Sequence, residues 1–268
     1  MSQYRGRGAQ KIMRQMKDLC MSVKGIRHFS ETLYCIRLEP INSGESVPSF
    51  APGQFVQLRI HAPEVLLRRP ISIYGGSEHH LDLLIQVAGK ATKYLSTAPI
   101  GTKVEVLGPL GNRFSDPTGE QILLVGGGVG IAPLLTMGRH LREEGCRPYF
   151  LLGARSETAF PDLKPFEELG KLLITTEDGS LGEIGFVTDH SVWSQGTPSD
   201  IYCCGPTPMM KAVASLARER KIRCEVSLEN MMACGIGICL CCVEPTVRGN
   251  VCVCTEGPVF NTKDLLWQ

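Results

Sequence analysis

The 268-residue sequence contains no run of about 18 apolar residues, so it offers no segment that could cross a membrane as a helix. It also lacks internal repeats and low-complexity segments. Neither sign of charge dominates, because 28 Lys and Arg stand against 27 Asp and Glu. The chain therefore has no broad basic surface of the kind that binds nucleic acid. Its composition, 43% hydrophobic and 21% charged, is that of a globular chain of about two domains.

The first 17 residues are basic, but no apolar stretch follows them. We therefore expect no secretory signal peptide there, and we interpret residues 1–17 as a solvated N-terminal arm. A chain without an export signal is expected in the cytoplasm, where thiols stay reduced.

Cysteine is abundant: the chain has 12, and six of them fall within 21 residues near its end. In a reducing compartment, clustered thiols favour metal ligation over disulfides. The six are Cys234, Cys239, Cys241, Cys242, Cys252 and Cys254.

Four of these cysteines have the C-x4-C-x2-C…C spacing of plant-type 2Fe–2S centres, with Cys254 as the last. Zinc sites more often use paired C-x2-C knuckles, and only Cys239 and Cys242 are spaced in that way, with no His nearby. The spacing thus predicts a 2Fe–2S cluster and leaves zinc as the weaker alternative. Cys252 could replace Cys254 on spacing alone, so the fourth ligand is open.

The pattern of the chain changes twice. Residues 18–118 contain short runs of Val, Ile, Leu and aromatics between turn residues, which predicts a β-barrel or sandwich, with one helix within 90–99. Over 119–223 strands alternate with helices, which predicts a parallel sheet with right-handed crossovers. Residues 224–268 hold the cysteine cluster. We therefore predict an α+β multidomain chain of barrel, α/β sheet and small C-terminal module.

Two glycine turns follow apolar strands of the predicted α/β part. Glycines in the first, residues 125–133, allow a close ligand approach, and the helix that follows favours a bound diphosphate. The second, residues 204–206, stands at another strand end, where such sheets bind ligands. Either alone could be a plain tight turn, since the first does not match GxGxxG well. The candidate nucleotide-site residues are Gly127, Gly128, Gly130, Cys204, Gly205 and Pro206.

A short polar motif interrupts the β part at residues 69–72, which read Arg-Pro-Ile-Ser. The guanidinium fork of Arg69 matches phosphate oxygens, and the Ser72 hydroxyl can add a hydrogen bond. The motif alone is weak, because a surface Arg beside an edge-strand Pro would look the same. Its position upstream of a glycine-rich α/β turn makes it a candidate phosphate contact.

In this order, RPIS in a β-barrel, GGGVGIAP, CGP and a C-terminal cysteine loop resemble the ferredoxin–NADP reductase superfamily. The segments LLRRPISI, TEDGSLGEIGFVTD, SLENMMACGIGIC and CTEGPVF look more closely like the electron-transfer subunits of two-component dihydroorotate dehydrogenases. The resemblance covers nearly the whole chain from about residue 18. It implies FAD in the barrel, NAD in the α/β domain and one 2Fe–2S cluster.

The resemblance also implies site residues, although none of them is assigned a catalytic role. The implied flavin contacts are Arg69, Pro70, Ile71, Ser72, Leu84, Ile85, Gln86, Ala91 and Thr92. Two positions depart from the family, which often has a basic residue at 86 and Gly in place of Ala91. The implied cluster ligands are Cys234, Cys239, Cys242 and Cys254. Cys254 is chosen as the fourth ligand because it precedes the EGPVF segment.

As an enzyme component, a chain of this kind is expected to link a nicotinamide to a one-electron carrier. In the family, electrons pass between this FAD and the FMN of a separate subunit that oxidises dihydroorotate in pyrimidine biosynthesis. We expect that partner, in a heterotetramer of two chains of each. An NAD(P)H-dependent ferredoxin or sulfur reductase subunit remains the alternative, although such relatives can have Asp where this chain has Cys234. The choice between NADH and NADPH stays open.

Overall fold

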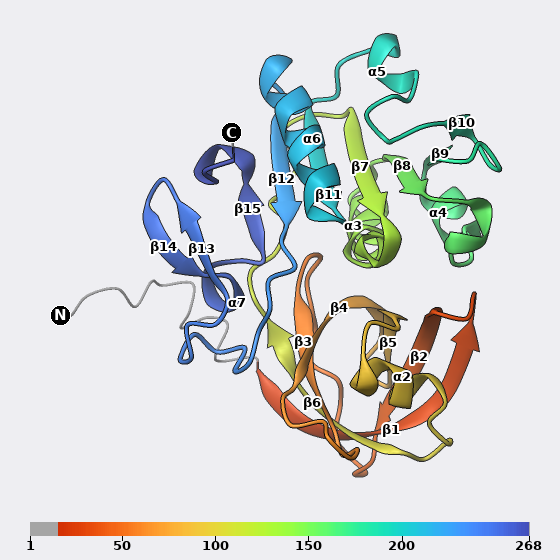
Figure 1. Ribbon diagram of the computed structural model, residues 1–268, viewed down its shortest axis with the longest axis vertical. Coiled ribbons are helices and arrows are strands. Elements are labelled where there is room, and N and C mark those ends of the chain that lie inside the picture. Colours follow the sequence, from red (N-terminus) through yellow and green to blue (C-terminus); the bar gives the residue numbers. More distant parts are fainter. Residues whose placement is uncertain (1–15, 268) are drawn as a thin grey trace.

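The computed structural model describes residues 16–267. Of the predicted arm, residues 1–15 lie outside the described residues. Figure 1 shows a barrel, a sheet flanked by helices, and a C-terminal module beside both. Within the described residues, no helix is long and apolar enough to span a membrane.

Six antiparallel strands close into a barrel in the order β1-β2-β5-β4-β3-β6, which confirms the predicted β-barrel. The strands are β1 (Lys17–His28), β2 (Leu33–Pro40), β3 (Phe55–Ile60), β4 (Arg69–Gly76), β5 (Leu81–Gln86) and β6 (Lys103–Leu110). Alternate side chains point inward, so that residues such as Met21, Ile36 and Leu58 fill the interior. Helix α2 (Lys90–Ser96) follows β5, as the sequence predicts.

A seven-stranded sheet forms the second region, in the order β10-β9-β8-β7-β11-β12-β15. Its strands are β7 (Ile122–Gly127), β8 (Tyr149–Ala154), β9 (Lys171–Thr176), β10 (Glu183–Ile184), β11 (Asp200–Cys204), β12 (Arg223–Ser227) and β15 (Val259–Asn261). The pairs from β10 to β12 are parallel, which confirms the predicted parallel sheet. Strand β7 is buried along its whole length because elements cover both faces, and this explains its continuous apolar run.

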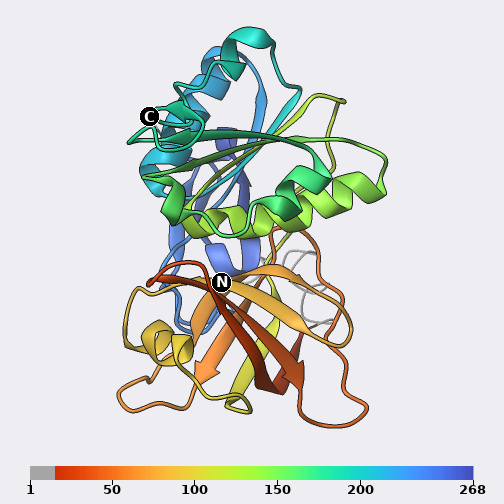
Figure 2. The same ribbon diagram turned by 90° about the vertical axis from the view of Figure 1, so that its right-hand side faces the viewer.

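The helical segments connect the strands of this sheet. They are η1 (Gly128–Ile131), α3 (Ala132–Glu143), η2 (Glu157–Ala159), α4 (Lys164–Leu169), α5 (Val192–Gln195) and α6 (Thr207–Glu219). Helix α3 lies between the sheet and the barrel (Figure 2), where Arg139 Nη1 donates to the carbonyl of Tyr74 at 3.3 Å. Helix α5 is short, and a turn precedes it in which the N–H of Phe186 donates to the carboxylate of Asp189.

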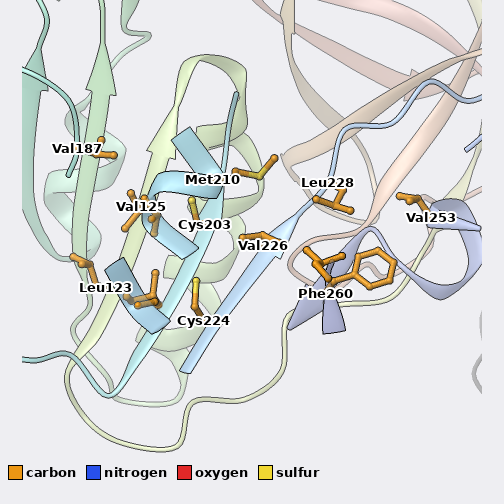
Figure 3. Packing of buried hydrophobic residues seen from close by; sticks show 14 of the residues in the cluster. Leu123, Val125, Val187, Cys203, Met210, Cys224, Val226, Leu228, Val253 and Phe260 are labelled. Atoms are coloured by element: carbon orange, nitrogen blue, oxygen red, sulfur yellow. The ribbon is translucent and has the colours of Figure 1, made fainter. Parts of the chain in front are cut away.

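The C-terminal module contains the hairpin β13 (Val243–Thr246) and β14 (Gly249–Cys252), α7 (Val253–Glu256) and η3 (Thr262–Asp264). Strand β15 then returns to the sheet and pairs antiparallel with β12, so the sheet extends past residue 223, where the sequence suggested its end. Figure 3 shows apolar packing that runs from the sheet to Leu228, Val253 and Phe260. The same cluster takes in Phe55 of the barrel. Barrel, sheet and module therefore meet in one apolar cluster, while the barrel interior forms a separate cluster of its own.

Candidate functional site

The two glycine turns meet at the carboxyl edge of the sheet. Strands β7 and β11 are neighbours, with Gly126 opposite Cys204. A Cβ on Gly130 would lie 2.5 Å from the carbonyl carbon and oxygen of Cys204, and one on Gly205 would lie 3.0 Å from the nitrogen of Gly127. Backbone packs on backbone here, and only glycine permits such an approach. The structure therefore brings the residues predicted from the two turns together.

The first turn also presents its backbone to open space. Gly128 has a φ of +56°, and nothing lies within 4 Å of its Cβ position. Helix α3 begins directly after η1, with Pro133 in its first turn. The unpaired N–H groups and partial positive charge of this helix end suit an anionic group such as a diphosphate.

Two titratable side chains flank the second turn. Burial raises the pKa of the Cys204 thiol well above its usual range, and the nearby charge of Glu229 raises it further. The thiol is therefore neutral at ordinary pH. Glu229 follows β12; the residue as a whole is exposed, yet surrounding protein atoms desolvate the carboxyl and raise its pKa. Glu229 lies in the SLENMMACGIGIC segment that carries the resemblance, but a single Glu after an apolar strand belongs to no spaced motif, so no role was predicted for it.

Strand β4 carries the RPIS motif on the barrel. Ser72 stands opposite Phe55, and residues 69–72 are half-buried. The Nη1 group of Arg69 donates to the carbonyl of Leu67 at 2.6 Å. That bond holds one arm of the guanidinium in place. The remaining donors of the planar group can then bind a phosphate.

Three residues at the end of β5 are predicted to contact the flavin; two of them can do so through side chains and one only through its backbone. Ile85 packs in the barrel interior, so it can reach a flavin only through its backbone. Leu84 belongs instead to the apolar cluster that contains Tyr74 of β4, and Gln86 is exposed. Because side chains alternate along a strand, Leu84 and Gln86 share the outer face.

The turn before α2 is held by a threonine. Thr92 Oγ1 accepts hydrogen bonds from the backbone N–H groups of Ala88 at 2.9 Å and Gly89 at 3.2 Å. The hydroxyl of Tyr34 donates to the carbonyl of Thr92 at 2.7 Å. Ala91 lies inside α2, so it needs no positive φ. The departure from Gly at this position therefore costs the turn no strain.

The cluster loop directs backbone N–H groups at sulfur. The N–H groups of Ile236, Ile238 and Cys239 lie 3.4, 3.4 and 3.5 Å from the sulfur of Cys234. Burial would raise the pKa of Cys234, but these hydrogen bonds outweigh it and lower the pKa to about 6. A thiolate is the form that binds metal, so the loop fits a metal–thiolate cluster.

Glycines shape the rest of this loop. Gly235 and Gly237 have φ of +72° and +78°, and the N–H of Gly237 donates to the sulfur of Cys254 at 3.1 Å. The N–H of Cys254 in turn lies 3.4 Å from the sulfur of Cys242. Positive φ turns these peptide groups toward the sulfurs, which is the conformation that the two glycines make accessible.

The six clustered cysteines differ in exposure. Cys242 and Cys254 are buried, while Cys239 and Cys241 are exposed. Desolvation raises the pKa of the half-buried Cys252, as do the charges of neighbouring cysteines. Cys252 therefore lies beside the predicted ligands too, and Cys254 as the fourth ligand stays a prediction.

Zinc and a two-iron cluster make different demands on these thiols. A structural zinc needs four donors around one ion, whereas a 2Fe–2S cluster shares its four thiolates between two irons. Within residues 16–267, no three or more His, Cys, Asp or Glu side chains are gathered around one point. The spacing of the cysteines is what favours the two-iron cluster.

Comparison with known families accounts for most of the chain. Residues 26–114 match the oxidoreductase FAD-binding domain, and residues 124–215 match the oxidoreductase NAD-binding domain. Residues 229–266 match the iron–sulfur cluster binding domain of dihydroorotate dehydrogenase B. These matches confirm the predicted FAD, NAD and iron–sulfur cluster.

Relatives and solved structures agree with these matches. The chain is 42% identical over 234 residues to the dihydroorotate dehydrogenase B (NAD(+)) electron transfer subunit of Shouchella clausii, covering 83% of this chain and 89% of the relative. It is 34% identical to the Enterococcus faecalis subunit of the same name, covering 94% and 99%.

Among solved structures, one from work on flavin-based electron bifurcation by an NADH-dependent reduced ferredoxin-NADP oxidoreductase aligns with a TM-score of 0.82. Its sequence identity is 30%, over 92% of this chain and 90% of that chain. The ferredoxin reductase of carbazole 1,9a-dioxygenase, at 19% identity and a TM-score of 0.65, shares the fold; 77% of this chain and 67% of that chain are covered. By sequence identity and coverage, the chain belongs to the family of dihydroorotate dehydrogenase B electron transfer subunits.

Proposed function

We propose that this chain carries electrons between the FMN of a dihydroorotate dehydrogenase catalytic subunit and NAD, in pyrimidine biosynthesis. The observation that carries the proposal is the apolar cluster at which the RPIS barrel, the sheet with the nucleotide edge and the cysteine module meet. Oxidation of one dihydroorotate to orotate releases two electrons and two protons, and NAD⁺ takes up a hydride. Bound FAD supplies the exchange between hydride and single electrons, while a 2Fe–2S cluster carries one electron at a time.

Each group of residues has a distinct task in this proposal. Arg69 and Ser72 bind the flavin diphosphate through charge and hydrogen bonds, and the backbone of β5 supports the ring. The interlocked turns at the sheet edge hold the nicotinamide nucleotide next to the neutral thiol of Cys204. The thiolates of the loop hold the cluster. The proposed ligands are Cys234, Cys239, Cys242 and Cys254.

The cluster loop also supports the proposed partner. Apolar side chains around the cysteines are exposed, with Met231 at 84%, Ile238 at 75% and Leu240 at 64%. Exposed apolar patches mark interaction sites, and methionine suits such surfaces. Met232, by contrast, is buried beneath the loop. We propose that this exposed face docks the catalytic subunit, in a heterotetramer of two chains of each, which would bring the cluster close to the interface.

The remaining parts of the proposal concern organisation and place. We propose FAD, NAD and cluster domains at residues 18–118, 119–223 and 224–268, with strand β15 returning from the cluster domain to the sheet. We also propose a cytoplasmic location, since a reducing compartment keeps the clustered thiols available for iron.

Co-expression with an FMN-containing dihydroorotate dehydrogenase subunit from the same source tests the function. We expect a stable complex that reduces NAD⁺ with dihydroorotate, whereas this chain alone should oxidise NADH only with acceptors such as ferricyanide. Failure of the two chains to associate would remove the proposal.

A second function is favoured by the structural likeness to the ferredoxin-NADP oxidoreductase. This chain could instead be an NAD(P)H-dependent ferredoxin or sulfur reductase subunit. Rapid electron transfer to ferredoxin, without association with a dihydroorotate dehydrogenase subunit, would establish this alternative. The cysteine at 234 favours the first function, because the alternative relatives can have Asp there.

A further inference from the structure

An unpaired amide lies buried between the barrel and the cluster loop. Gln57, in the middle of β3, has no solvent-exposed surface. Neither its Oε1 nor its Nε2 has a hydrogen-bond partner within the described part of the chain. An amide without partners is costly to bury, since it loses its hydrogen bonds to water. The position therefore calls for a partner that these protein atoms do not supply.

The place of Gln57 indicates where that partner is. Its neighbours Val56 and Leu58 belong to the barrel interior, so its own side chain faces outward. On that face it stands opposite Pro70 of the RPIS strand. Leu107, its partner on β6, packs against the apolar cluster that includes the cysteine module.

The cluster loop rests directly on this amide. The three atoms nearest to a Cβ built on Gly235 all belong to Gln57: Cγ at 2.8 Å, Nε2 at 3.0 Å and Cδ at 3.2 Å. A side chain at 235 would push the amide away, so glycine keeps Gln57 against the loop. Gly235 directly follows the proposed ligand Cys234. Gln57 thus lies between the proposed flavin strand and the first cluster ligand.

We propose that Nε2 of Gln57 donates a hydrogen bond to a sulfur of the iron–sulfur cluster, and so raises the cluster's reduction potential. The cluster is favoured over the flavin because the contacts of the amide are with the loop that holds Cys234. A donor near the cluster stabilises the extra negative charge of its reduced form, and hydrogen bonds to the sulfurs are among the factors that set such potentials. Gln57 is therefore a positioning and tuning residue, and this inference rests on the proposed cluster.

The test compares two glutamines in the full-length holoprotein. Gln57→Met keeps the length of the side chain but removes the donor. We expect reduction of the cluster to become about tenfold less favourable, equivalent to about 59 mV for a one-electron couple. Redox titration followed by electron paramagnetic resonance measures this shift, with iron content unchanged. Gln57→Leu provides a second variant if the first does not fold.

Gln54→Met is the matched control. Its amide is already paired within the chain, accepting from the N–H of Ala51 at 2.8 Å and donating to the carbonyl of Gly111 at 2.9 Å. We therefore expect this variant to lower thermal stability while leaving the cluster potential unchanged. An equal shift of potential in both variants would show a general packing effect and overturn the inference.

The remaining outcomes distinguish a failure of this inference from a failure of the proposed function on which it rests. A shift confined to the flavin potential in Gln57→Met would assign the amide to the flavin and overturn the inference. If neither potential shifts in Gln57→Met, Gln57 has only a packing role and the inference is overturned. If the unaltered protein binds no iron–sulfur cluster, the proposed function itself fails before any variant is compared.

Discussion

The sheet edge and the cluster loop are both built on glycine turns, but different contacts hold them. At the sheet edge, Gly130 packs against the backbone of Cys204. In the loop, the space around the glycines is closed by side chains: Gln57 against Gly235, and Thr255 against Gly237, at 2.9 Å from its Cβ position. Backbone cannot move aside as a side chain can. The nucleotide edge is therefore preformed, whereas the loop depends for its shape on the sulfur ligands and what they bind.

Replacing a proposed cysteine ligand of the cluster is expected to have the largest effect, and it should affect the cluster loop without affecting the sheet edge. Serine at each proposed ligand should abolish bound iron and the cluster's share of the visible absorbance, leaving that of the flavin, because a hydroxyl does not replace a thiolate. The proposed ligands are Cys234, Cys239, Cys242 and Cys254. NADH binding at the sheet edge should persist in the same variants, measured by fluorescence titration.

Cys241→Ser and Cys252→Ser are the matched controls and should keep the iron. If Cys252→Ser loses the iron and the cluster absorbance while Cys254→Ser keeps them, the fourth ligand is Cys252. Loss of NADH binding together with the iron would show that the sheet edge is not preformed.

The next largest effect is expected on the free energy of unfolding, from a change at Asp200 in the sheet. The buried carboxylate of Asp200 accepts hydrogen bonds from the N–H of Thr118 at 2.8 Å and from Nη1 of Arg223 at 2.6 Å. Burial alone would raise the pKa of Asp200, but these bonds outweigh it and lower the pKa. Asp200→Asn breaks a buried ion pair and should lower the free energy of unfolding by about 3 kcal/mol at neutral pH.

The pH dependence of this effect follows from the sign of the shift. A carboxyl with a depressed folded-state pKa stabilises the protein above its unfolded-state pKa, and that contribution is lost as pH falls through the folded-state value. Denaturation curves across acid pH should therefore fall less steeply for Asp200→Asn. The exposed Glu64, paired with Lys90, is the control, and Glu64→Gln should change stability by less than about 1 kcal/mol. An equal effect of the two variants would contradict the role of Asp200.

The sequence could predict the elements that depend on local patterns, but not the contacts between residues far apart along the chain. Strand periodicity and turn residues predicted the barrel, the parallel sheet and α2, because these patterns reflect local geometry. The return of β15 to the sheet was missed, since a three-residue antiparallel edge strand carries too little pattern. Gln57 was missed for another reason: its amide lies against Gly235, which is far away along the chain, and no local pattern shows such a contact.

The next prediction concerns the loss of FAD affinity when Arg69 of the flavin site is removed. Arg69 already anchors one arm on the backbone carbonyl of Leu67, so its fork is directed before FAD arrives. A hydrogen bond to a charged group contributes about 1.5–3 kcal/mol, so Arg69→Ala should weaken FAD binding about 10- to 150-fold. Equilibrium dialysis with flavin fluorescence measures the loss. Arg59→Ala on β3, whose side chain is exposed, is the control. Unchanged FAD affinity after Arg69→Ala would remove Arg69 from the site.

The smallest expected effect tests the backbone contact itself. Gly130→Ala places a methyl group 2.5 Å from the backbone of Cys204 and Gly205, so strand and turn have to separate. Overpacking of this kind costs about 1–3 kcal/mol, and NADH affinity should fall with it while iron content stays unchanged. Gly196→Ala is the matched control: its backbone is extended and nothing lies within 4 Å of its Cβ position. If Gly130→Ala is as stable as Gly196→Ala and binds NADH equally well, the sheet edge yields as easily as the cluster loop, and the distinction between a preformed edge and a ligand-dependent loop does not hold.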